Sequence, residues 1–312
     1  LSDRVIWTIA IAVLLSSNRR AIRIRTVAGA FLIQVALGAL VLYVPWGREA
    51  LVESRLSPEL GERWGAAVAA VGGRMLLIRA PGQHAASDGF QSRRVFVSGG
   101  LAGGGWLLEG VALTEDEFDA VPWPLVAAGD VAGVRAACAW LRPAAPGLPV
   151  CTDANRLRCC ALRGRPIVND LAAEGLRVWE CSHTGGHRFA PTGVVLPLGQ
   201  VVGRLSVELG REVLDAAASG RFAMGSLTEA HDRGVSFLPP REQAAVSAVR
   251  AGTGETEPIA LAVVGDDGAT VTVQHAGGRV WEVAVVRAEG QALPESCGKP
   301  AKPSETWRVA PA

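Results

Sequence analysis

The sequence lacks an excess of charge of either sign, because its 31 Lys and Arg residues are nearly balanced by 30 Asp and Glu residues. Aromatic residues make up only 5% of the chain and do not alternate with basic runs. Proteins that bind nucleic acid need clustered positive charge, commonly with aromatic side chains on which bases stack. We therefore expect no nucleic acid partner.

The motifs of several hydrolase classes are also missing. No serine lies in a GxSxG elbow, and no pair of carboxylates can be assigned as the acid and nucleophile of a glycosidase. The glycine-rich run at residues 99–105 lacks the Lys-Ser/Thr of a P-loop and the GxGxxG spacing, so it predicts a flexible hairpin. These absences argue against a hydrolase.

Cysteine is present, and its distribution is uneven. The six cysteines are Cys138, Cys151, Cys159, Cys160, Cys181 and Cys297. Four of them fall within about thirty residues, which favours a metal site in a reducing compartment over a disulfide scaffold. We therefore expect a cytoplasmic protein.

Two cysteines and two histidines form the candidate metal-binding set. Cys151 and Cys160 have C-x8-C spacing, and His183 and His187 have H-x3-H spacing with two glycines between them. Thiolates and imidazoles are the ligands of iron–sulfur clusters and of zinc. The glycines, and the absence of Glu after His183, argue against a helical HExxH site. Zinc fits the wide cysteine spacing poorly, but a Cys2His2 zinc site remains chemically acceptable.

Three further residues adjoin this set. Cys159 precedes Cys160, and Cys181 lies two positions before His183 in a predicted strand, so Cys181 and His183 face the same side. We assign both cysteines to the surroundings of the site or to the core. Arg188 follows His187 and would place positive charge beside the site, or is a surface arginine.

The fold class expected from the pattern is α/β with an apolar, membrane-like N-terminal segment. In residues 1–45 two apolar runs flank a basic turn, and only the second, 27–44, has the roughly 17 residues that a span needs. A first α/β lobe is predicted at 46–143, with residues 114–124 as a candidate boundary.

The second lobe, at 144–222, has the order strand, helix, strand, hairpin, helix of a thioredoxin-like domain. Its first strand ends at Cys151, a wide loop carries Cys160, and the helix is predicted over 166–174. Residues 223–312 predict a helix and strands, followed by an irregular end from about 296.

Residues 151–205, with outlying stretches such as PWGREALVESRL and LPPREQAAVSAVR, resemble the sucrase/ferredoxin-like family of thioredoxin-like ferredoxins. The resemblance covers most of residues 45–312. It implies a [2Fe–2S] cluster held by Cys151, Cys160, His183 and His187, one-electron transfer, and an unknown redox partner protein. Histidine ligation raises the potential above that of all-cysteine clusters, and we expect the potential to fall as pH rises.

The stretch AVLLSSNRRAIRIRTVAGAFLIQVALGALVLYVPWG resembles the N-terminus of concentrative nucleoside transporters. Later segments are too polar and strand-like for transporter helices, so we expect no nucleoside transport. The string PWGRE, at residues 45–49, is shared by both resemblances and marks the predicted join of a composite chain. Two alternatives stay open, a zinc-stabilised thioredoxin-like binding module and a non-functional membrane-anchored composite. A membrane partner is expected only if the N-terminal segment is genuine.

Overall fold

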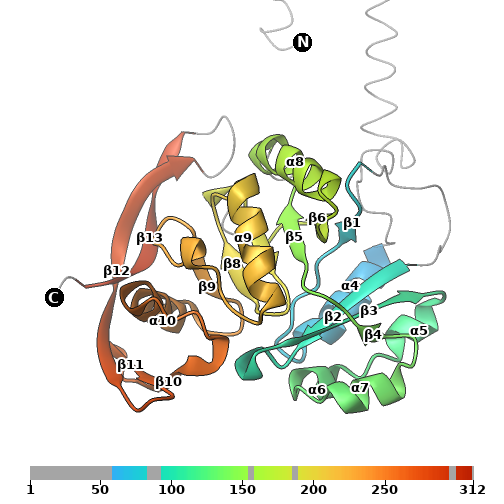
Figure 1. Cartoon of the computed structure of the whole chain (residues 1–312), viewed down its shortest axis with the longest axis horizontal. Helices are drawn as coiled ribbons and strands as arrows, with labels where there is room; N and C mark the ends of the chain where they lie inside the picture. Colours follow the sequence, from blue (N-terminus) through green and yellow to red (C-terminus); the bar gives the residue numbers. More distant parts are fainter. Residues whose placement is uncertain (1–57, 83–92, 154–157, 185–188, 295–299, 311–312) are drawn as a thin grey trace, which may run out of the picture. The chain divides into compact units, whose positions relative to one another are not determined.

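The computed structural model describes residues 58–82, 93–153, 158–184, 189–294 and 300–310. All of them belong to the second of two units, Leu56–Ala312, whereas the first unit, Leu1–Arg55, lies outside them, as does the predicted segment 1–45. They form helices and three sheets (Figure 1), which confirms the α/β expectation. Within these ranges, no helix combines the length and the apolar character that a bilayer crossing requires.

The largest sheet has six strands in the order β1-β6-β5-β7-β8-β9. Its strands are β1 (Ile78–Arg79), β5 (Leu148–Cys151), β6 (Val178–Cys181), β7 (Gly193–Val195), β8 (Gln200–Val202) and β9 (Asp232–Val235). β5 and β6 are parallel and are connected through α8 (Arg158–Ala173), as a parallel pair requires a crossover. Their carboxyl ends therefore meet at one sheet edge, where Cys151 lies opposite Cys181.

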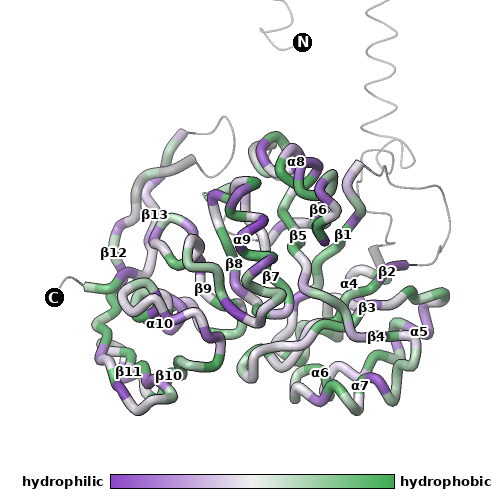
Figure 2. Tube along the Cα trace, viewed as in Figure 1, coloured by the Kyte–Doolittle hydropathy of each residue, from purple (hydrophilic) through white to green (hydrophobic). Residues whose placement is uncertain are grey.

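Helix α9 (Val207–Ala218) shows why the sequence forms these elements. Ser206 caps its N-terminus by accepting a hydrogen bond from the backbone N–H of Leu209. Leu209, Val213 and Leu214 recur at helical spacing and are buried in the same cluster as strands β5 to β9. Each such side chain contributes about 1.5–3 kcal/mol on burial. Hydrophobic and hydrophilic positions alternate along α8 and α9 (Figure 2).

A three-stranded sheet precedes the six-stranded one in the chain. It consists of β2 (Arg93–Gly99), β3 (Trp106–Ala112) and β4 (Arg142–Pro143), with a short η2 helix (Leu101–Gly103) in the predicted hairpin between β2 and β3. The helices of this region are α4 (Pro58–Ala69), α5 (Glu115–Asp119), α6 (Trp123–Ala127) and α7 (Val131–Ala137).

The candidate boundary at residues 114–124 is wrong, because this segment folds into α5 and the start of α6. Thr114 and Glu117 form a capping box that starts α5. Phe118 then packs against Trp64 of α4, with ring centroids 4.1 Å apart. The acidic run thus begins a helix that is held in the same region by aromatic contacts.

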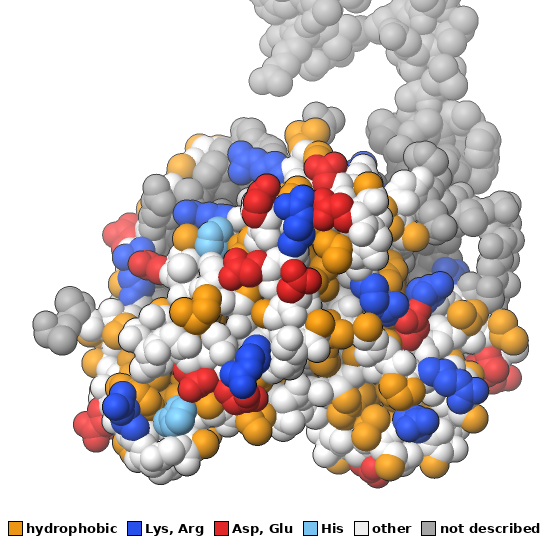
Figure 3. All heavy atoms as spheres, in the orientation of Figure 1, with side chains coloured by type: hydrophobic (Ala, Val, Ile, Leu, Met, Phe, Trp, Pro, Cys, Tyr) orange, Lys and Arg blue, Asp and Glu red, His pale blue; other side chains and the backbone are white. Residues whose placement is uncertain are grey.

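A four-stranded antiparallel sheet follows, in the order β10-β11-β12-β13. Its elements are β10 (Leu261–Asp266), β11 (Thr270–His275), β12 (Val280–Pro294), β13 (Ala301–Val309) and the packed helix α10 (Pro240–Thr253). The prediction of an irregular end is wrong for residues 301–309, because β13 pairs with β12 from Val285↔Val309 to Pro294↔Ala301. On the face seen in Figure 3, acidic and basic side chains are intermixed, as their nearly equal numbers suggest.

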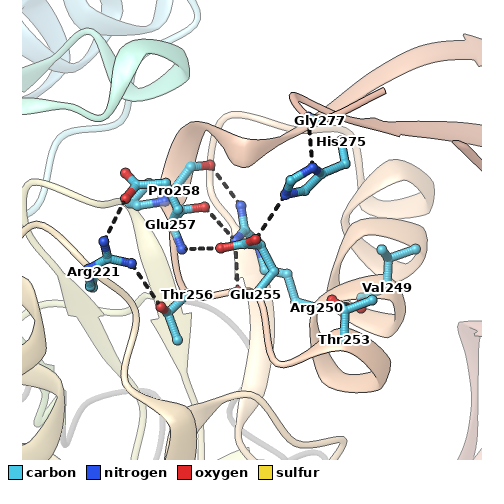
Figure 4. A network of polar contacts seen from close by, with 10 residues as sticks. All are labelled: Arg221, Val249, Arg250, Thr253, Glu255, Thr256, Glu257, Pro258, His275 and Gly277. Atoms are coloured by element: carbon cyan, nitrogen blue, oxygen red, sulfur yellow. Dashed lines mark hydrogen bonds and ion pairs between the residues drawn. The ribbon is translucent and has the colours of Figure 1, made fainter. Parts of the chain in front are cut away.

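A buried arginine fixes the turn between α10 and β10 (Figure 4). Arg250 is 3% exposed and donates hydrogen bonds to the backbone carbonyls of Glu255, Glu257 and Pro258 at 2.7–3.1 Å. Its guanidinium also lies 4.5 Å from the ring centroid of Phe222, which follows α9. Arg250 therefore ties the four-stranded sheet to the end of α9.

Candidate metal centre

Cys151 and Cys160 meet where β5 ends and α8 begins. Cys151 is the last residue of β5 and is 0% exposed, and Cys160 is the third residue of α8 and is 1% exposed. The prediction that Cys160 lies in a wide loop and that the helix starts at Pro166 is wrong, because α8 begins at Arg158.

Packing explains the early start of α8. Cys160, Gly164, Val168 and Leu171 recur at helical spacing and are all buried, so burial of this face outweighs the cost of Pro166 inside the helix. A Cβ atom on Gly164 would lie 2.8 Å from the carbonyl oxygen of Cys151. Glycine at this position therefore allows the helix to approach the strand that carries the first thiol.

A third thiol and several apolar side chains enclose the pair. Cys181, 4% exposed, lies in one buried cluster with Cys151, Cys160 and Ala190. Leu76 and Ile78, before and within β1, pack against the same cluster. Cys138 lies elsewhere, in the core of the three-stranded sheet, and Cys297 lies outside the described residues. All four described cysteine side chains are free thiols.

The predicted histidine ligand reaches the same point. His183 is half-buried, lies two residues beyond the end of β6, and is hydrogen-bonded to the Cys151 sulfur. Its carbonyl accepts a hydrogen bond of 2.7 Å from Arg74. The structure therefore places Cys151 and Cys160 in one buried cluster, with His183 beside Cys151.

The remaining predicted residues cannot be placed. His187 and Arg188, as well as the side chain of Cys159, lie outside the described residues, and their roles stay predictions. Within the described part of the chain, no three His, Cys, Asp or Glu residues form a set that could hold a metal ion.

Burial and a hydrogen bond between Cys151 and Cys160 shift the pKa values of the clustered thiols in opposite directions. The hydrogen bond from Cys160 lowers the pKa of Cys151 to about 5, helped by the backbone N–H groups of Asp153 and Thr184 and opposed by burial. The same contact and burial raise the pKa of Cys160. Burial raises the pKa of Cys181. The lowered pKa favours the thiolate form of Cys151, the protonation state that binds a metal. The donor chemistry fits an iron–sulfur cluster.

A buried ion-pair network adjoins the thiol cluster, and the sequence did not predict it. The Glu180 carboxylate accepts hydrogen bonds from Arg79 at 2.6 and 3.2 Å, from Arg165 at 3.2 Å and from Thr152 at 2.8 Å. Burial raises the pKa of Glu180, but the bonds from Arg79 and Thr152 outweigh it and lower the pKa overall. Thr152 follows Cys151, so this network fixes the end of β5.

Comparison with known proteins divides the chain in two. Residues 107–233, which include the thiol cluster, match the sucrase/ferredoxin-like family, and residues 5–53 match the N-terminus of Na+ dependent nucleoside transporters. The thiol-bearing strands β5 and β6 both lie inside the first match. No solved structure matches the chain.

Curated relatives were found for the N-terminal part. An uncharacterized transporter of Haemophilus influenzae is 70% identical over 43 residues, which are 14% of this chain and 10% of that protein. Nucleoside permease NupC of Helicobacter pylori is 68% identical over 41 residues, 13% of this chain and 10% of that protein. The chain thus spans about a tenth of the length of these relatives. It is a composite, in which a sucrase/ferredoxin-like segment that carries the thiol cluster follows an N-terminal stretch similar to nucleoside transporters.

Proposed function

We propose that this chain is an iron–sulfur redox protein that transfers one electron at a time through a [2Fe–2S] cluster held by Cys151, Cys160, His183 and His187. The observation that supports this most directly is the pair of thiols of Cys151 and Cys160, which are 0% and 1% exposed and lie in one buried cluster. Such a cluster, when bound, supplies reversible one-electron chemistry. The match of residues 107–233 to sucrase/ferredoxin-like proteins agrees with this assignment.

The residues around the pair would prepare the site in two ways. Leu76, Ile78 and Ala190 exclude water from the sulfur atoms. Cys151 holds a negative charge on its sulfur while Cys160 keeps its proton, which must leave when both sulfurs bind iron. Binding should therefore release a proton.

Fold and surroundings support the same proposal. The observed order β5, α8, β6, the β7–β8 hairpin and α9 is that of a thioredoxin-like lobe, which we propose as the scaffold of the cluster. Buried free thiols suit a reducing compartment, so the proposal includes a cytoplasmic location and a redox partner protein.

Iron analysis of ligand variants tests the proposal. Anaerobically reconstituted protein should be red-brown with about two irons per chain. Cys151→Ser and Cys160→Ser should lose the colour and most of the iron. Cys138→Ser is the matched control, because Cys138 is also buried but packs near Ala120, with its sulfur 3.7 Å from that carbonyl oxygen. Colourless protein with bound zinc would instead support the zinc module and contradict the proposal.

A further inference from the structure

We propose that an exposed surface beside the thiol cluster is the docking site for an acidic one-electron carrier protein. The surface consists of Leu162, Arg163 and Arg165 of α8 and Arg79 of β1, and we call it the α8 docking surface. This inference rests on the proposed function, because it names the partner class of the same site.

The position of the surface follows from the helix. Leu162 lies two residues beyond Cys160, about 3 Å along the axis of α8. Leu162 and Arg165 are three residues apart and share one side of the helix. Residues two apart lie on nearly opposite sides of a helix, so a partner resting on this side would be about one helix width, roughly 10 Å, from the buried thiols, which are not themselves accessible.

The surface is apolar at one point. Leu162 is 72% exposed, the most exposed of the large hydrophobic side chains among the described residues. Protein interfaces commonly place an apolar contact within a polar rim. Leu162 would supply that contact, and the neighbouring arginines would supply the rim.

The rim is positively charged because the Glu180 carboxylate, which pairs with two of its arginines, is buried. The Glu180 side chain is 5% exposed and binds Arg79 and Arg165, whose side chains remain 26% and 38% exposed. One negative charge thus orders two guanidinium groups that still face solvent. Arg163 is exposed as well and adds a third positive charge.

The surroundings strengthen the positive field. Arg74 is exposed and donates to the His183 carbonyl, so it adds a further cation near the thiol cluster. The nearby described carboxylate outside the network, Asp153, is only half-buried and offsets one of these charges. Asp170 lies eight residues after Leu162, about 12 Å along α8.

These features select a protein with an acidic surface as the partner. Complementary charge speeds encounter, and small interfaces with modest burial are typical of transient electron-transfer complexes. The surface contains no aromatic side chain on which a base could stack and only one apolar side chain for insertion into lipid. We therefore favour an acidic protein over nucleic acid or a membrane.

The test uses the cluster-loaded full chain and a reduced plant-type ferredoxin as an acidic probe. The ferredoxin is oxidised by one electron and this chain is reduced by one, in the downhill direction expected for a histidine-ligated cluster. Stopped-flow rates should fall as NaCl is raised. Leu162→Glu and Arg163→Glu should each slow the reaction about fivefold at low salt, and reduction by dithionite should be unchanged.

Two matched controls lie away from the surface. Leu113→Glu replaces a leucine that is 64% exposed after β3, and Arg135→Glu reverses an exposed arginine of α7. Neither should change the rate. Equal slowing by test and control variants, or a rate that does not depend on salt, would overturn the docking surface. Binding of the chain to phosphatidylserine vesicles that depends on Arg163, together with an electron-transfer rate from ferredoxin that Arg163→Glu leaves unchanged, would also overturn it.

Failure of the proposed function would look different. A protein without iron would refute the cluster by its spectrum alone. Calorimetric titration of that protein with oxidised ferredoxin would still test the surface, because Leu162 and Arg163 are exposed without any ligand bound. Binding that weakens with salt and with Leu162→Glu would support it, and absence of binding would contradict it.

Discussion

Replacement of Glu180 by Gln should destabilise the protein at neutral pH and have little effect in acid. Glu180→Gln keeps the size of the side chain but removes the charge that holds Arg79 and Arg165. Charge-assisted hydrogen bonds contribute about 1.5–3 kcal/mol each. Both arginines are partly exposed and become hydrated in the variant. We therefore count one hydrogen bond for each arginine, at about 1.5 kcal/mol, which lowers the free energy of unfolding by about 3 kcal/mol in total.

The pH dependence follows from the lowered pKa of Glu180 in the folded protein. A lowered folded pKa gives stability that is present above the unfolded value, about 4.3, and is lost as pH falls through the folded pKa. The melting temperature of the variant should therefore lie about 6–12 °C below wild type at pH 7. The difference should shrink steadily below pH 4.

Thermal unfolding followed by tryptophan fluorescence from pH 7 to pH 3 measures this difference. Glu174→Gln is the control, because Glu174 pairs with Arg211 at 2.6 Å but both side chains are about two-fifths exposed. Its effect should be much smaller than that of Glu180→Gln, because solvent screens an exposed pair. A Glu180→Gln difference that is constant over this pH range, or that grows in acid, would refute the reasoning.

Three further predictions concern other parts of the molecule. Arg250→Met leaves three partly buried carbonyls without their donor and should lower the free energy of unfolding in urea by about 3–5 kcal/mol. A loss under about 1 kcal/mol would show that these bonds contribute little. Gly164→Ala should push α8 away from Cys151 and reduce both the melting temperature and the bound iron. Gly252→Ala, in an open position of α10, should change neither. Equal effects of the two variants would argue against a close approach of α8 to β5 at Gly164. His183→Cys should retain a cluster with a weaker pH dependence of its potential, measured by voltammetry, and an unchanged slope would argue against His183 as a ligand.

Local patterns predicted much of the fold because the deciding contacts are close in sequence. The strand that ends at Cys151 follows from a short apolar run, the hairpin before α9 from alternation, and the start of α9 from the capping residue Ser206. The start of α8 did not follow, because Pro166 is a strong local signal for a first turn. Its position is decided instead by packing of Cys160 and Gly164 against β5.

Contacts between distant residues account for the remaining differences. Glu180 and Arg79 are separated by 101 residues, and no local pattern marks them as partners. Strand β13 contains Pro303 and Lys302, which are uncommon within strands, and it forms because β12 offers a long edge for pairing. The proximity of Cys151 and Cys160 was predicted from their spacing, and the structure buries both in one cluster, whereas the assignment of Cys151, Cys160, His183 and His187 as ligands stays a prediction.

The central claim, a cluster with mixed cysteine and histidine ligation, is tested most directly by pulsed EPR of the dithionite-reduced protein. Histidine nitrogens bound to iron couple magnetically to the unpaired electron, whereas cysteine sulfur gives no such coupling. The account predicts a [2Fe–2S] signal with couplings from two nitrogens, one of which disappears in His183→Cys. A signal without nitrogen coupling, or no signal in iron-loaded protein, would contradict it.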